Sequence, residues 1–169
     1  MTMMDTLKRA ISGDDADGAD ADILESLKQD HEDVAEMLEK LVESTTAAQR
    51  RSLLTSINNA LVPHLRAEEK IVYAAIGALR GKEQKIHSEE GRMEHALGDR
   101  MLQQLGKMTD PMSAAFSAGA KVLKELVEHH VEEEEKNIWS DVEERFSDED
   151  RVAMNKKFLA AKRRVKVPA

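Results

Sequence analysis

The sequence predicts an all-α protein built around a four-helix bundle, and three observations support this fold class. The composition is rich in Ala, Leu, Glu and Lys, and only 3% of the residues are aromatic, which favours helices over strands. Apolar residues recur at three- and four-residue spacing through four long stretches. A histidine motif occurs twice at matching positions, so the chain divides into two helix-hairpin halves.

Caps and turn residues set the expected helix ends. Asp22 is a plausible N-cap for the first helix, Arg80-Gly81 ends the second, and a Thr-Asp-Pro run at 109–111 separates the third from the fourth. Ser147 is expected to cap a shorter fifth helix. The four long helices are expected at 22–43, 47–79, 82–108 and 112–146.

Three regions are expected along the chain. Residues 1–21 form a flexible N-terminal arm and acidic linker, because Asp and Gly dominate the end of this stretch. Residues 22–146 form the bundle. Residues 147–169 form a C-terminal helix and a basic tail, and we expect the cations of this tail to be a solvated helix end that the helix dipole favours.

The composition excludes several classes of function. The chain has no cysteine, so disulfides, thiolate metal sites and iron–sulfur clusters are ruled out. A formal net charge of −8 argues against nucleic acid and anionic membranes as partners. No stretch approaches the length of a membrane span or of a signal-peptide apolar core. We therefore expect a cytoplasmic protein of unknown oligomeric state.

The repeated motif is the most informative feature of the chain. Residues 64–70 and 130–136 both read His-x-x-x-Glu-Glu-Lys. Each copy also has a histidine upstream at nearly equal distance, since His31 lies 33 residues before His64 and His95 lies 35 residues before His130. One His-x-x-x-acid pair would arise by chance in so acidic a chain, but two copies in register would not.

This spacing predicts a dinuclear metal site. Residues four apart on a helix are neighbours on one face, and apolar neighbours place each histidine on the buried stripe of its helix. Uncompensated burial of these polar groups would be costly, and metal ions remove that cost. Imidazole and carboxylate ligands suit iron, manganese or zinc. The candidate ligands are His31, His64, Glu68, His95, His130 and Glu134.

Two further histidines were weighed as ligands. His129 also has a glutamate four residues on, but alignment of the two Glu-Glu-Lys runs places His130, not His129, opposite His64. We expect His129 at the edge of the buried face. His87 is about 80° off the face of His95 on an ideal helix, which predicts a position near the surface.

These motifs resemble the bacterial hemerythrin-like family, also called the HHE cation-binding domain. The resemblance covers roughly residues 22–146, and four motifs in order carry it. They are Leu27 to His31, His64 to Glu69, Met93 to Ala96, and Val127 to Glu135. Ferritin-like bundles are the nearest competitor, but they use Glu-x-x-His pairs, which is the reverse order and a different step.

The resemblance implies an up-down-up-down bundle that holds two iron ions. It assigns His31 and His64 to one iron, His95 and His130 to the other, and bridging positions to both glutamates. Oxygen-carrying hemerythrins have a further histidine where this chain has Gly91. Water, hydroxide, Glu90 or Glu94 could take the place of that ligand, and the open position favours peroxide or nitric-oxide chemistry over simple oxygen carriage.

Three functions remain open from the sequence. The first is a redox-active di-iron protein that binds dioxygen, nitric oxide or peroxide, with disproportionation of hydrogen peroxide as its enzymatic form. The second is a non-catalytic iron store, or a sensor of iron or oxygen. The third is a structural helical protein whose histidines are satisfied core residues; the duplicated motif speaks against it.

Overall fold

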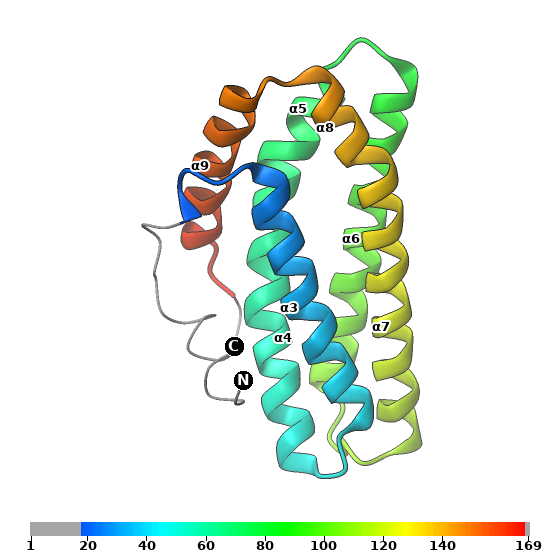
Figure 1. The fold of residues 1–169 in the computed structure, drawn as a ribbon. Helices are drawn as coiled ribbons and strands as arrows, with labels where there is room; N and C mark the ends of the chain where they lie inside the picture. Colours follow the sequence, from blue (N-terminus) through cyan, green and yellow to red (C-terminus); the bar gives the residue numbers. More distant parts are fainter. Residues whose placement is uncertain (1–17, 168–169) are drawn as a thin grey trace.

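The computed structural model describes residues 18–167, and this part of the chain is helical with no strands. Four long helical rods run up and down beside one another, and a fifth helix lies outside them (Figure 1). This arrangement confirms the expected all-α bundle. The elements are α3 (Ile23–Glu43), α4 (Ala47–Glu68), η1 (Glu69–Tyr73), α5 (Ala74–Gly77), α6 (Lys82–Lys107), α7 (Ala114–Glu133), η2 (Glu134–Ile138), α8 (Trp139–Arg145) and α9 (Asp148–Arg164).

The first and third rods match the expected helices almost to the residue. Asp22 caps α3, because its side chain accepts a hydrogen bond from the backbone nitrogen of Leu24 at 2.9 Å. The second and fourth rods differ from expectation, since each is interrupted. A π-helical turn, η1 or η2, begins inside each copy of the motif, and the α-helix then resumes as α5 or α8.

The apolar core is divided into two clusters along the bundle. One cluster contains Val34, Leu61 and Val127 and fills one end. The other contains Leu27 and Val72 and includes residues of α9. On α3 the candidate ligand His31 lies between residues of the two clusters, and on the second and fourth rods Glu68 and Glu134 do. A polar layer therefore separates two hydrophobic cores, and the rods must be held together across it.

Helix α9 packs along α4 and α3 on the outer side of the bundle (Figure 1). Its first turn is closed by a capping box in which Ser147 and Asp150 bind each other's backbone nitrogens. Asn155 is fully buried and donates to the backbone oxygens of Gly18 and Ala21. The end of the acidic linker is thus attached to α9, while residues 1–17 of the expected arm lie outside the described residues.

None of the helices within residues 18–167 is long and apolar enough to cross a membrane.

We expect Phe158→Ala to lower the free energy of unfolding by about 3–5 kcal/mol, as for other buried aromatic residues cut back to alanine. The Phe158 side chain is fully buried where α9 meets the bundle. Urea unfolding followed by circular dichroism measures the change. Lys157→Ala on the exposed face of α9 is the control, with an expected change within about 0.5 kcal/mol. Equal effects of the two substitutions would mean that α9 is not docked.

Candidate metal centre

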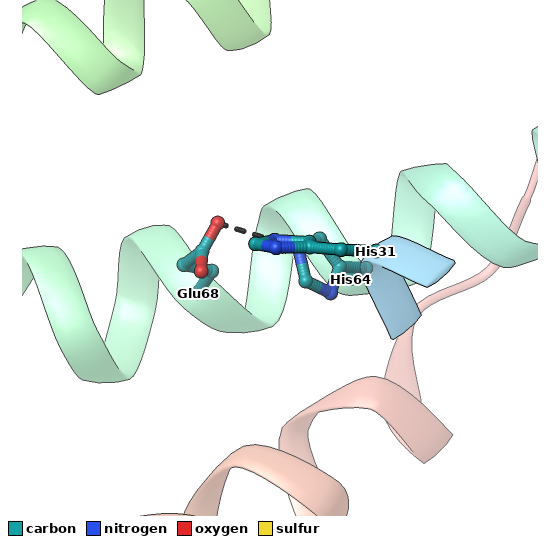
Figure 2. A group of neighbouring side chains, drawn as sticks. All are labelled: His31, His64 and Glu68. Atoms are coloured by element: carbon teal, nitrogen blue, oxygen red, sulfur yellow. Dashed lines mark ion pairs between the residues drawn. The ribbon is translucent and has the colours of Figure 1, made fainter. Parts of the chain in front are cut away.

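The structure brings together all six predicted site residues, and none of them is more than 6% exposed. His64 and Glu68 lie one turn apart on α4, with Nε2 of His64 3.5 Å from Oε2 of Glu68, and His31 reaches the same place from α3 (Figure 2). Oε2 of Glu68 is also 3.3 Å from Nε2 of His95 on α6. Glu68 therefore lies between the two histidine pairs, as a bridging carboxylate would.

Glu134 repeats this arrangement in the second half of the chain. Its Oε2 lies 3.2 Å from Nε2 of His31 and 3.6 Å from Nε2 of His130. The Nε2 atoms of His95 and His130 are 3.2 Å apart. Four imidazoles and two carboxylates thus converge around one buried space, and two groups of residues close enough to hold an ion share Glu68.

The polar atoms in this space fit a metal and not a hydrogen-bonded core. Buried side-chain atoms are usually paired, yet several atoms of this cluster have no hydrogen-bond partner among the described residues. They are both ring nitrogens of His31, Nε2 of His64, both oxygens of Glu68 and Oε2 of Glu134. Imidazole nitrogen and carboxylate oxygen form a donor set that binds first-row transition metals. The residues present therefore fit a cation site.

An outer ring of four carboxylates holds the histidines. Each Nδ1 faces one carboxylate, whereas each Nε2 faces the centre. The Nδ1-to-oxygen distances are 2.9 Å for His64 and Asp30, 3.0 Å for His95 and Glu69, 2.8 Å for His130 and Glu94, and 3.5 Å for His31 and Glu135. Such contacts fix ring orientation and leave Nε2 free to bind a metal.

The ring follows a rule that the two halves share. The acid just before the upstream histidine, Asp30 or Glu94, binds the second histidine of its own half. The second glutamate of the motif, Glu69 or Glu135, faces the upstream histidine of the opposite half. The sequence displayed these acids beside each ligand, but it did not show which histidine each one meets.

The carboxylates change the proton affinity of the buried histidines. Burial alone lowers the pKa of His64, but the charge of Glu68 and the hydrogen bond to Asp30 outweigh it and raise that pKa to about 10. Burial also opposes ionisation of Asp30, yet His64 and then Lys162 hold the pKa of Asp30 below its usual value. The metal-free centre therefore holds protons that a cation must displace.

Tyr73, which is not among the six candidate ligands, also contacts the centre. Its hydroxyl donates a hydrogen bond to Oε1 of Glu134 at 2.9 Å and lies 3.3 Å from Nε2 of His95. A Cβ atom on Gly91 would fall 2.5 Å from the Tyr73 hydroxyl oxygen. The phenol therefore fills the space beside Gly91, the position at which oxygen-carrying hemerythrins have a further histidine. Burial and then the charge of Glu68 hold the pKa of Tyr73 well above its ordinary value.

The π-helical turns account for the position of Tyr73 at the centre. On a regular α-helix a residue five positions on is rotated by about 140°, which would turn Tyr73 away from the face of Glu68. A π-helical turn carries an extra residue, so that both side chains reach the centre. Trp139 follows η2 in the same way, and its ring stacks on His31 with 5.9 Å between ring centroids and 15° between planes.

The two remaining histidines lie outside this cluster. His129 is 62% exposed, with Nε2 3.4 Å from Glu94, which agrees with the expected position at the edge of the face. His87 is only 23% exposed, so it is less superficial than expected. Its Nδ1 donates to Oδ2 of Asp141 at 2.9 Å.

Two cavities reach the centre from opposite sides. A small one of about 10 Å³ is lined by Tyr73, His130 and Glu134 of the centre and by His87, and it has room for about one water molecule. A larger one of about 340 Å³ lies between α3 and α7, where His31 forms part of its wall. Each half of the centre therefore borders a cavity.

Comparison with known proteins identifies the family. A family model described as the hemerythrin HHE cation binding domain matches residues 22–140. This match covers well over half of the chain. The chain belongs to the hemerythrin HHE family. The resemblance predicted from the four motifs is thereby confirmed, and cation binding is the property that the family description states.

One curated relative of this HHE protein is a protein of Nostoc sp. named DNA nickase. It is 24% identical over 152 residues, which is 89% of this chain. The chain spans only 42% of the length of that relative. No solved structure matches the chain.

We expect Gly91→Ala to lower the free energy of unfolding of the metal-free protein by about 1–3 kcal/mol, because the added methyl group would displace the Tyr73 ring. In a Tyr73→Ala background the same change should instead stabilise the protein by about 0.5–1 kcal/mol, since alanine favours a helix over glycine. Urea unfolding of the four proteins in this cycle measures both values. The same sign in both backgrounds would contradict the contact.

We expect the metal-free protein to lose stability as the pH rises from 6.5 to about 10, the two limits that the pKa of His64 sets. Below that interval the folded and unfolded states both hold the proton, and the contribution of His64 is complete; above it the contribution is lost. The melting temperature should fall by about 3 °C or more. Metal-loaded protein, which needs neutral imidazole, and a His64→Gln variant should lack this fall. A flat profile for the metal-free protein would contradict the prediction.

Proposed function

We propose that this protein is a non-haem di-iron protein that binds dioxygen, nitric oxide or peroxide and disproportionates hydrogen peroxide. The observation that carries the proposal is the convergence of four imidazole Nε2 atoms on two buried carboxylates, three of whose four oxygens have no hydrogen-bond partner among the described residues. The residues proposed to hold the irons are His31 and His64 for one, His95 and His130 for the other, and Glu68 and Glu134 as bridges.

The residues around the centre support a small oxidant as substrate. An iron pair held by these residues would supply two electrons to one peroxide and recover two from another. The cavity beside Tyr73 and His130 has room for about one water-sized molecule, at about 10 Å³, which matches a peroxide or a diatomic gas in size. The Tyr73 hydroxyl orients Glu134 by its hydrogen bond, and the two apolar clusters limit the entry of water from either end of the bundle.

The alternatives have less support in the described residues. An iron store or sensor would need the same ligands, and it becomes the better description if the loaded protein proves unreactive. Nicking of DNA is suggested only by the name of the Nostoc relative. A formal charge of −8 disfavours a phosphate backbone as partner, so we keep small oxidants as the proposed substrates.

The test is iron analysis combined with oxygen release from hydrogen peroxide. We expect two irons per wild-type chain, a melting temperature that falls on chelation because ligands stabilise the folded state, and oxygen evolution on addition of peroxide. His130→Ala should lose iron and activity, whereas His129→Ala should keep both, because its side chain is 62% exposed.

A second readout is the fluorescence of Trp139, the single tryptophan of the chain. Its ring stacks on His31, so iron binding should quench it in the wild type. Zinc or manganese in place of iron, or a wild-type protein without iron, would overturn the di-iron proposal. A loaded protein that is inert to peroxide, oxygen and nitric oxide would leave the iron store or sensor.

A further inference from the structure

A histidine that is no candidate ligand stands at the small cavity of the centre. His87 of α6 lines this cavity together with Tyr73, His130 and Glu134. It lies far in sequence from every candidate ligand except His95, from which eight residues separate it. A titratable ring next to the reaction space, but outside the metal-binding set, is suited to handle protons and not the metal.

The orientation of the His87 ring is fixed by a buried carboxylate. Nδ1 of His87 donates to Oδ2 of Asp141 at 2.9 Å, and the Asp141 side chain is only 8% exposed. The other oxygen of Asp141 accepts a hydrogen bond from Nε2 of Gln84 at 2.8 Å. Because Nδ1 carries the donated hydrogen, Nε2 of neutral His87 is the nitrogen that can accept a proton. A histidine oriented in this way by an aspartate is the arrangement that general bases use.

The other titratable groups at this cavity are engaged elsewhere. The Tyr73 hydroxyl donates to Glu134. Glu94 accepts from Nδ1 of His130, which outweighs burial and lowers the pKa of Glu94. Glu133 accepts from the side-chain amide of Asn137, and Glu90 is an exposed carboxylate. Histidine is the side chain suited to take and return a proton near neutral pH.

We propose that His87, oriented by Asp141, is the acid–base residue of peroxide turnover at this centre. The inference rests on the proposed function. One peroxide loses two electrons and two protons and leaves as dioxygen. The other gains two electrons and two protons, its O–O bond breaks, and two waters form. Nε2 of His87 takes one proton from the first peroxide and returns it to the second, and the other proton passes through solvent water. The electron pair would pass through the proposed iron centre.

The larger cavity offers no comparable group. Its wall contains a lysine and several carboxylates, and the only imidazole among its described lining residues is that of His31, a candidate ligand. Peroxide turnover is therefore assigned to the side of the centre that Tyr73 and His130 border. The cavity beside His31 is left as a path for solvent.

The experiment compares His87→Gln and Asp141→Asn with wild type and with His129→Gln as a matched control. Iron content, quenching of Trp139 fluorescence and melting temperature are measured first. Oxygen release from hydrogen peroxide is then followed in water and in heavy water. We expect His87→Gln to keep its iron and its quenching, to lose turnover by about 100-fold or more, and to show a larger solvent isotope effect. Asp141→Asn should lose turnover to a smaller extent.

Three other outcomes would overturn the inference about His87. Turnover of iron-loaded His87→Gln within twofold of wild type would mean that His87 carries no proton. Loss of iron from both variants would give the pair a structural role instead. A wild-type protein that holds two irons but releases no oxygen would overturn the proposed activity, and His87 would then have no peroxide reaction to serve. The wild-type measurement alone separates this failure of the proposed function from a failure of the role assigned to His87.

Discussion

Burial of four imidazoles and two carboxylates in one layer is the constraint on which the rest of the structure depends. Hydrogen bonds alone do not compensate the burial of this layer. Several of its oxygens and nitrogens have no hydrogen-bond partner among the described residues and face only one another. Unpaired buried polar atoms each cost about 1–3 kcal/mol. The apolar clusters on either side must therefore hold the rods in place until a cation compensates the layer.

The outer carboxylates connect this layer to the rest of the molecule. Asp30 meets both His64 of α4 and Lys162 of α9, and Phe158 of α9 lies edge-on to the His64 ring. The sequence suggested that the basic tail is a solvated helix end. For Lys162 this expectation is wrong, because its side chain binds Asp30. The C-terminal helix, which lies outside the four rods, is in this way joined to the candidate ligands by packing and by charge.

Much of this fold and site could be predicted because the information was local or repeated. Helix ends followed from caps such as Asp22 and Ser147, and the six inner residues followed from one motif written twice. The π-helical turns could not be predicted, since they depend on packing around the layer, and the hydrogen bond from Tyr73 to Glu134 could not be predicted without them. The contact of Glu69 with His95 and the pair of His87 with Asp141 join distant helices, so spacing along the chain does not reveal them.

The outer ring also has a charge pattern that is alike around the two histidine pairs, which are the proposed metal positions. Near the first pair, Asp30 is bound by Lys162, whereas Glu135, beside His31, has no lysine or arginine partner among residues 18–167. Near the second pair, Glu69 is bound by Arg66, whereas Glu94 meets only histidines. Each position thus has one neutralised and one uncompensated outer carboxylate. Since such partners tune the reduction potential of a metal, two metals held as proposed would have similar surroundings and therefore similar potentials.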